Sequence, residues 1–235
     1  MADFVLVHGA WHGAWCWRRV LPALWTQGHR AFAVSLSGVG ERAHQPSGDI
    51  RLTTHIDDVA AVIEAEELQR VVLVGHSYAG MLITAVADRM SERIAHLVYL
   101  DAIVPHSGES WASFHDDATR AVRRATIAKG GHLPPPDAAI YALPADDEAW
   151  VARRMRPHPG GVYEDALHFD AARVAALPRT FVDCTSPALP GVARSRPRVR
   201  SEPGWHVIEI ATGHDLMVGV PQQLISILVE VAASA

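Results

Sequence analysis

Segment 71–80 constrains the fold of this 235-residue chain more than any other part of the sequence. It opens with four apolar residues, Val71-Val72-Leu73-Val74, as expected of a central parallel strand that is covered on both faces. Gly75-His76-Ser77-Tyr78-Ala79-Gly80 follows, and residues 81–90 have a helical pattern. The sequence therefore predicts a strand, a tight turn that carries a serine, and a helix in direct succession.

Strand-like and helix-like segments alternate along much of the chain. Short β-branched and aliphatic runs are separated by amphipathic stretches, which is the pattern of an α/β protein with a mostly parallel sheet. Helices are expected over about 15–27, where Gly28 provides the stop, from Ile56 to Ile63 and over 81–90. We expect about six strands flanked by helices, with strands near 4–7, 31–36, 71–74, 94–100, 181–182 and 205–210.

The middle of the chain departs from this alternation. Between about 105 and 177 the strand pattern vanishes, and helical segments take over that are separated by Gly130-Gly131 and Pro134-Pro135-Pro136. We interpret 105–177 as a helical cap inserted into a core made of 1–104 and 178–235. Core and cap together are expected to form one structural domain.

Composition narrows the class of protein. Hydrophobic residues make up 49% of the chain, charged residues 20%, and the formal net charge is −5, as in ordinary globular proteins. No apolar run approaches the length of a membrane span and no stripe of Lys and Arg stands out, so neither a membrane nor a nucleic acid is expected as partner. The N-terminus lacks a signal-peptide pattern and the two cysteines form no disulfide framework, which together predict a cytoplasmic protein.

Ser77 and His214 are the candidate nucleophile and general base. Residues 75–79 match the G-x-S-x-G nucleophile elbow, with the small Ala79 in the last slot, although a serine that merely caps the helix is the structural alternative. In this arrangement the base comes last in the chain, and His214 follows the final predicted strand, at the sheet edge where Ser77 is expected. The chain has 14 histidines, and we expect most of the others to be structural or solvated, with no metal site.

The acid that orients the histidine has two candidates. Asp183 falls within a predicted strand, so its side chain should point toward the covering helices and not toward His214. Asp101 ends the strand next to the elbow strand, from where its side chain can reach His214. We therefore give Asp101 the role of holding the imidazole tautomer and stabilising the imidazolium, with a turn aspartate as the structural alternative.

Backbone amides are expected to stabilise the negative charge that develops in acyl transfer. Tyr78, directly after the nucleophile, and Ala10, in the loop after the first strand, would supply the two N–H groups of an oxyanion hole. Gly9 has no side chain, so the backbone there can approach the substrate carbonyl closely. The candidate substrate-binding residues are that glycine and five aromatic residues that could line an apolar pocket: Gly9, Trp11, Trp111, Phe114, Trp150 and Phe169.

Three segments resemble those of a known family. FVLVHGAWHGAW at 4–15, GHSYAG at 75–80 and GHD at 213–215 are similar to the α/β-hydrolase family of plant methylesterases and hydroxynitrile lyases with their bacterial esterase relatives. The resemblance covers both ends of the chain and the elbow. It implies the α/β-hydrolase fold, with Ser77 as nucleophile, His214 as base, and the amides of Ala10 and Tyr78 as the oxyanion hole.

Departures from the family pattern favour an esterase over a lyase. The lyases carry threonine where Gly9 stands and lysine directly after the last histidine, where this chain has Asp215. A lyase needs a cation to receive cyanide, and Asp215 puts a carboxylate there instead. The family's usual acid after the strand near Cys184 is missing, and haloalkane dehalogenases are similar in carrying their acid at the position of Asp101.

We expect a serine carboxylesterase that hydrolyses small to medium apolar esters and uses neither a metal nor an organic cofactor. Two alternatives stay open. One is a C–C lyase of the hydroxynitrile-lyase type, and the other is a small-molecule receptor of the same fold with vestigial hydrolysis. The expected partner is the ester substrate, and the oligomeric state is open, with a homodimer as one candidate.

Overall fold

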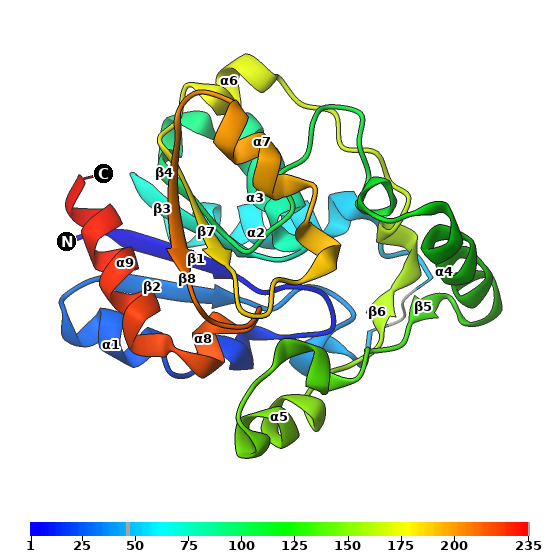
Figure 1. The fold of residues 1–235 in the computed structure, drawn as a ribbon. Helices are drawn as coiled ribbons and strands as arrows, with labels where there is room; N and C mark the ends of the chain where they lie inside the picture. Colours follow the sequence, from blue (N-terminus) through cyan, green and yellow to red (C-terminus); the bar gives the residue numbers. More distant parts are fainter. Residues whose placement is uncertain (46–47, 235) are drawn as a thin grey trace.

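The computed structural model describes residues 1–45 and 48–234. Its centre is a six-stranded sheet with the strand order β2-β1-β3-β4-β7-β8, and each neighbouring pair is parallel. Figure 1 shows helices on both faces of this sheet. The predicted α/β architecture, with a mostly parallel sheet of six strands, is confirmed.

The strands lie where the apolar runs predict them. The strand predicted at 94–100 is found with the same bounds, and the one at 205–210 likewise. The central strand is buried along its whole length, as its four consecutive apolar residues indicate. The six strands are β1 (Asp3–Val7), β2 (Arg30–Val34), β3 (Val71–His76), β4 (Ile94–Leu100), β7 (Arg179–Cys184) and β8 (Trp205–Ile210).

Side-chain alternation along the strands builds two hydrophobic clusters, one on each face of the sheet. In β3, Val71 and Leu73 pack into the cluster that includes α2 and α3, whereas Val72 and Val74 pack into the cluster that includes α1 and α9. The helices are α1 (Leu21–Thr26), α2 (Leu52–Ala65), α3 (Ala79–Arg89), α4 (Asp117–Gly130), α5 (Ala145–Ala152), α6 (Ala171–Ala175), α7 (Ser195–Ser201), α8 (Leu216–Gly219) and α9 (Pro221–Ser234).

The first predicted helix is shorter than expected. Residues Ala14–Trp17 form a separate 3₁₀ turn, and α1 begins only at Leu21. Pro22 explains this start, because proline lacks the N–H of a helix interior but is tolerated in the first turn. The helical pattern ends as predicted at Gly28, whose φ of 80° is the left-handed conformation that favours glycine.

The segment 105–177 is mostly helical, as expected, but it also contains strands. A short antiparallel ribbon pairs β5 (His132–Leu133) with β6 (His158–Pro159), which corrects the expectation that strands vanish here. Strands of two residues are too short to show an alternating pattern in the sequence. In Figure 1, α4, α5 and this ribbon lie beside the sheet, while α6 packs on α3. The division into core and cap stays a prediction.

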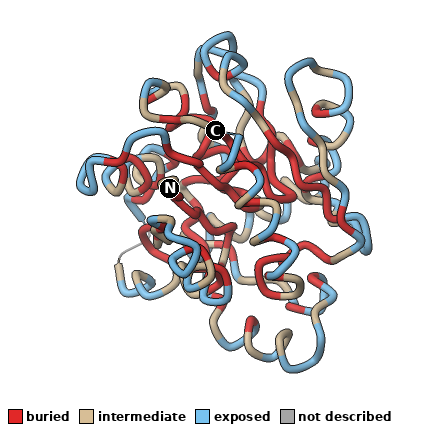
Figure 2. The backbone as a smooth tube through the Cα atoms, turned by 90° about the vertical axis from the view of Figure 1, so that its left-hand side faces the viewer, coloured by how far each residue is buried: buried red, intermediate tan, exposed pale blue. Residues whose placement is uncertain are grey.

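Figure 2 shows the buried residues concentrated in the interior of the molecule, with exposed segments at the periphery. This arrangement leaves the loops after the strands to form a site, because the carboxyl ends of parallel strands meet at one edge of the sheet. Within residues 1–45 and 48–234, no helix is long and apolar enough to cross a membrane.

Candidate active site

Ser77 lies on a sharp turn between β3 and α3. Its φ of 56° is left-handed, which is unusual for a residue with a side chain, and its N–H donates to the carbonyl oxygen of Leu100 at 3.2 Å. A Cβ on Gly80 would lie only 1.9 Å from the carbonyl oxygen of Ile103. Gly80 is therefore the residue at which the helix closely approaches the neighbouring loop. The last position of the motif, one residue earlier, can for this reason hold Ala79.

His214 and Asp101 meet at the carboxyl edge of the sheet. His214 follows β8 and Asp101 follows β4, and Nδ1 of the imidazole lies 2.7 Å from Oδ2 of the carboxylate. Both side chains are buried. With Nδ1–H donated to Asp101, the other ring nitrogen, Nε2, is the one that can accept a proton. The contact expected from the sequence is present, and its catalytic role stays a proposal.

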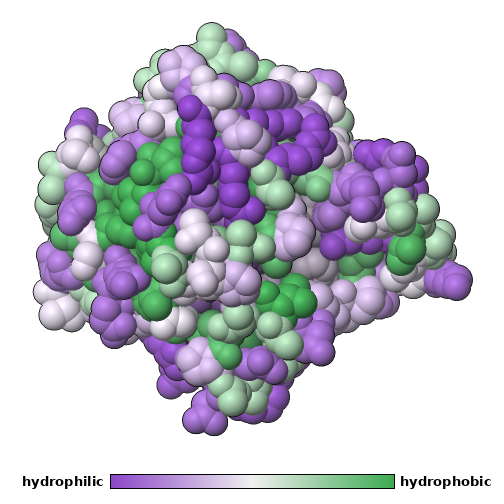
Figure 3. All heavy atoms as spheres, in the orientation of Figure 1, coloured by the Kyte–Doolittle hydropathy of each residue, from purple (hydrophilic) through white to green (hydrophobic). Residues whose placement is uncertain are grey.

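An arginine network separates the two candidate acids. Nη2 of Arg196 lies 2.8 Å from Oδ1 of Asp101, and Nε of the same arginine lies 2.6 Å from Oδ1 of Asp183. Arg200 contacts the other oxygen of Asp183 at 2.6 Å. Asp183 thus points toward α7 and not toward His214, as its position within a strand predicts. In Figure 3 hydrophilic side chains gather over α7.

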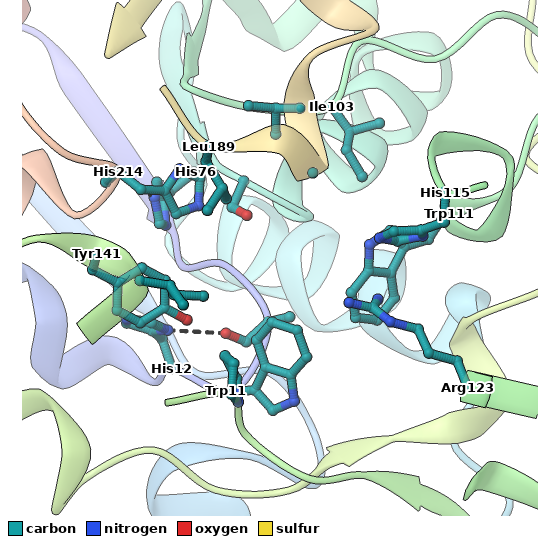
Figure 4. Close-up of a pocket in the computed structure, with 16 residues that line it drawn as sticks. Trp11, His12, His76, Ile103, Trp111, His115, Arg123, Tyr141, Leu189 and His214 are labelled. Atoms are coloured by element: carbon teal, nitrogen blue, oxygen red, sulfur yellow. Dashed lines mark hydrogen bonds between the residues drawn. The ribbon is translucent and has the colours of Figure 1, made fainter. Parts of the chain in front are cut away.

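A cavity of about 180 Å³ opens beside Ser77 and His214. Figure 4 shows His76 and His214 on one side of it and Trp111, His115 and Arg123 on the other. Most of the lining is apolar or aromatic, and a few polar groups converge on it. The lining residues are Ala10, Trp11, His12, His76, Ser77, Ile103, Trp111, His115, Arg123, Pro136, Ile140, Tyr141, Leu189, Gly191, Val192 and His214.

The expected oxyanion-hole residues differ in how they face this cavity. Ala10 lines it, and its neighbour Trp11 does too. The side chain of Tyr78 turns away from it, with the hydroxyl 3.2 Å from Nδ1 of His55 and the ring against Trp111. Only the backbone N–H of Tyr78 is therefore available for the expected role, which stays a prediction.

Four of the six expected substrate-binding residues lie elsewhere, and only Trp11 and Trp111 line the cavity. Gly9 packs against the elbow, because a Cβ there would lie 2.8 Å from Cβ of Ser77. Phe114 is covered by arginines of the α7 region, and Trp150 packs edge to face on Trp15. Phe169 lines a separate cavity together with Trp205. Aromatic residue type does not reveal which way a ring points, and a substrate-binding role for these four residues stays a prediction.

A buried ion pair behind His214 was not expected from the sequence. Nε2 of His12 lies 2.8 Å from Oδ2 of Asp215, and both residues are almost fully buried. Burial opposes charge on both groups, but the opposite charges outweigh it, so the pKa of His12 is raised and that of Asp215 is lowered. Asp215 thus forms a buried pair with His12 and is not among the residues that line the cavity.

His76 fills the space between this pair and His214. Its ring centroid lies 4.4 Å from that of His214, and its Nε2–H donates to the His214 carbonyl oxygen at 3.0 Å. Burial, followed by the neighbouring His214, lowers the pKa of His76 well below its usual range, so the ring is neutral near pH 7. Sequence reasoning left His12 and His76 without a function, although both lie in the segments that carry the family resemblance.

One group of side chains has the composition of a metal site. His76, His214 and Asp215 each offer one ligand atom within 4.8 Å of the others. Tetrahedral zinc, with bonds of about 2.1 Å, needs ligand atoms about 3.4 Å apart. One nitrogen of each ring is also engaged, by the His214 carbonyl and by Asp101. The group fits a network of protein hydrogen bonds better than a metal centre.

A match to a protein-family model shows which family the chain belongs to. The model described as "Alpha/beta hydrolase family" matches residues 4–227. The chain belongs to the alpha/beta hydrolase family. The membership that the motifs at 4–15, 75–80 and 213–215 indicate is thereby confirmed.

The hydrolase has curated relatives along its whole length. It is 40% identical over 234 residues to "Carbendazim hydrolyzing esterase" of Nocardioides sp. (strain SG-4G), covering 95% of this chain and 97% of the relative. It is 29% identical over 253 residues to "Methylesterase 1" of Arabidopsis thaliana, covering 97% and 95%. These relatives are a bacterial esterase and a plant methylesterase, the two groups to which the motifs point.

Solved structures share the fold of the hydrolase. An extracellular alpha/beta-hydrolase from a Paenibacillus species superposes with a TM-score of 0.85 at 18% identity, covering 98% of this chain and 99% of that one. A methylesterase protein from Arabidopsis gives a TM-score of 0.79 at 22% identity and covers both chains completely. At such identities the likeness shows the fold alone.

Proposed function

We propose that this hydrolase is a serine carboxylesterase that cleaves small to medium apolar carboxylic esters through an acyl-enzyme on Ser77. The observation that carries the proposal is the arrangement of three side chains. Ser77, on its left-handed turn, and His214 line the same cavity, and Asp101 holds Nδ1 of His214 at 2.7 Å. This is the arrangement that activates a hydroxyl as a nucleophile.

In the acylation half-reaction, Oγ of Ser77 attacks the ester carbonyl carbon while Nε2 of His214 takes the hydroxyl proton. The tetrahedral intermediate carries its negative charge on the former carbonyl oxygen, toward which the N–H groups of Ala10 and Tyr78 would point. The imidazolium of His214, stabilised by Asp101, gives its proton to the leaving alkoxide. The C–O bond breaks, the alcohol departs, and an ester of Ser77 remains.

In the deacylation half-reaction, water replaces the alcohol. His214 takes a proton from the water as its oxygen attacks the acyl carbon, and the same two amides stabilise the second tetrahedral intermediate. The proton then returns from His214 to Oγ of Ser77, which releases the carboxylic acid. Every proton in the cycle passes through one imidazole, so the chain's own residues suffice for the proposed reaction.

The coarse class, a carboxylic ester hydrolase, is supported by relatives that are named as esterases. The size preference is supported by the cavity itself. A volume of about 180 Å³, with Ile103, Leu189 and Val192 among the lining residues, suits a small apolar acyl or alcohol group.

A panel of p-nitrophenyl esters, from acetate to octanoate, tests the proposal. We expect the wild type to turn over the short members repeatedly, and Ser77→Ala to lower kcat by at least about 10⁴-fold. Ser226→Ala is the matched control, because Ser226 is an exposed serine of α9 that lies outside the cavity, and it should behave as the wild type.

Two outcomes would point to the other functions considered. Cyanide release from mandelonitrile without ester turnover would indicate a lyase. A single stoichiometric release of p-nitrophenol, or tight ligand binding without turnover, would indicate a receptor.

A further inference from the structure

Arg123 brings a positive charge into the cavity on the side opposite His76 and His214. The side chain comes from α4, and Figure 4 shows its guanidinium beside Trp111, across the cavity from His214. Three aromatic rings surround it. The guanidinium carbon lies 5.7, 5.2 and 5.5 Å from the ring centroids of Trp11, Trp111 and Tyr163. Cation–π contacts of this kind hold the side chain in place without neutralising its charge.

Arg123 differs from the other arginines of α4 in having no acidic partner. Arg120 pairs with Asp117, and Arg124 pairs with Glu164 at 2.5 Å. Among the residues that the structure describes, no carboxylate lies within 4.0 Å of the Arg123 guanidinium, and its Nη1 is buried without a hydrogen-bond acceptor. Burial lowers the pKa of Arg123, but arginine starts so high that the group stays charged. A buried donor on a full charge without an acceptor is costly, and a ligand can relieve that cost.

His115, the neighbouring titratable residue, adds no charge at this end of the cavity. Nδ1 of His115 lies 3.3 Å from the hydroxyl oxygen of Tyr163. Burial, and after it the charge of Arg123, lowers the pKa of His115 to about 4, so this imidazole is neutral at pH 7. The site therefore has one positive charge, a planar fork of N–H donors and aromatic walls. A carboxylate matches it in charge and in shape.

We propose that the esters cleaved at Ser77 carry a carboxylate at the far end of an apolar body, as the half-esters of dicarboxylic acids do, and that Arg123 binds this carboxylate. The inference rests on the proposed esterase function and specifies its substrates. The ester carbonyl lies at Ser77, the apolar body spans the cavity, and the carboxylate ends between Trp11 and Trp111. This orientation keeps the substrate's own negative charge away from the oxyanion that forms beside Ala10.

The test compares monomethyl esters of C4 to C8 dicarboxylic acids with methyl alkanoates of equal length. For the wild type we expect kcat/KM to favour the half-ester by about 10- to 100-fold at the best length, the effect of one charge-assisted hydrogen-bonded contact. In Arg123→Met this ratio should fall toward 1, and Arg123→Lys should recover part of it. Arg120→Met is the matched control from the next turn of the same helix and should keep the wild-type ratio.

The outcomes separate this inference from the proposed function. A wild type that prefers the neutral ester at every length would overturn the inference while leaving the esterase function intact, and this comparison needs no variant. A half-ester preference that survives in Arg123→Met would also overturn it. If the wild type hydrolyses neither series and does not turn over p-nitrophenyl acetate, the esterase function itself has failed.

Discussion

Asp101 and Asp183 are the same residue type, and their surroundings decide which of the two carboxylates can hydrogen-bond to His214. Both lie at the carboxyl end of neighbouring strands, and both contact Arg196. Only Asp101 has its second oxygen on His214, whereas the second oxygen of Asp183 is held by Arg200. Asp101 can therefore orient the imidazole, and Asp183 can only balance the charge of the arginines.

Exchanging each of the two carboxylates for an amide should have opposite consequences. Asp101→Asn should lower kcat on a short ester by a factor on the order of 10⁴, because the amide no longer selects the productive tautomer of His214. Asp183→Asn should leave kcat within about threefold but lower the free energy of unfolding by about 2 to 3 kcal/mol, because two arginines lose a buried counter-charge. Ester kinetics and urea denaturation on both variants measure the two effects. A large loss of kcat in Asp183→Asn would reverse the assignment.

The positions of single residues could be predicted where a motif fixes the backbone. They could not be predicted where tertiary packing decides the direction of a side chain. Ser77 and His214 follow from the elbow and from chain order, and Asp101 follows from counting which strand ends beside the elbow. Arg123 carries no such signal, because it is one of 21 Lys and Arg residues and only the packing of α4 turns it inward. Residue type likewise did not indicate that Trp11 and Trp111 line the cavity whereas Phe114, Trp150 and Phe169 do not.

The elbow between β3 and α3 depends on two glycines, Gly75 and Gly80, that each allow a different close backbone contact. A Cβ on Gly75 would meet the carbonyl oxygen of Ala79 at 2.9 Å, and one on Gly80 would meet that of Ile103 at 1.9 Å. Both contacts are with backbone, which cannot move aside as a flexible side chain can. The second contact also involves the loop after β4, which carries Asp101, so Gly80 joins the nucleophile turn to the loop of the acid.

Adding one methyl group at this junction should therefore be costly. Gly80→Ala should lower the free energy of unfolding by about 3 kcal/mol or more, because the backbone near Ile103 has to shift. Activity should fall as well, since that shift displaces Asp101 from His214. Gly48→Ala is the matched control, because a Cβ there would meet nothing within 4 Å. Equal stability of the two variants in urea would show that the elbow tolerates the extra atom.

Longer elements were predicted better than short ones. The strands β4 and β8 have the predicted bounds, because most of their residues are apolar although His96, His206 and Glu209 interrupt the runs. The β5–β6 ribbon went unnoticed, because strands of two residues leave no periodic pattern. The 3₁₀ turn at Ala14–Trp17 was merged with α1, since both carry large apolar residues and only Pro22 marks the boundary.

Across the whole molecule, the abundance of histidines reflects burial more than catalysis. Nδ1 of His8 donates to the carbonyl oxygen of Gly9 at 2.8 Å, and its Nε2 accepts the N–H of Leu36 at 3.2 Å, which only the neutral ring can do. Burial lowers the pKa of His8 to about 3. Burial likewise lowers the pKa of His55, to about 4, and of His158 and His76, well below the usual range. These rings are packed in the neutral form.

This packing predicts an acid-sensitive fold. A histidine whose folded pKa is lowered contributes stability that is present above its unfolded pKa of about 6.5 and is lost as the pH falls. Each contributes about 1.4 kcal/mol per pH unit below that point, so the four together contribute about 5.5 kcal/mol per unit. His12, whose pKa is raised, acts oppositely: its contribution is complete below about 6.5 and is lost at higher pH.

We therefore expect the free energy of unfolding to fall steeply between pH 7 and pH 5, with cooperative acid unfolding above pH 4. Urea denaturation at intervals of half a pH unit measures this slope. His44→Gln, which removes an exposed histidine, should leave the slope unchanged. Constant stability from pH 7 to pH 5 would contradict the neutral packing of His8, His55, His76 and His158.

The central claim is that one serine forms a covalent intermediate with the help of His214, and phosphorylation of that serine tests it most directly. The wild type is treated with diethyl p-nitrophenyl phosphate, which transfers its diethylphosphoryl group to an activated serine and releases p-nitrophenol. Intact-mass and peptide mass spectrometry should show one such group per chain, on the peptide that contains Ser77. Ser77→Ala should show none, and His214→Ala should react far more slowly. A group attached to another residue, or ester turnover that persists in Ser77→Ala, would contradict the account.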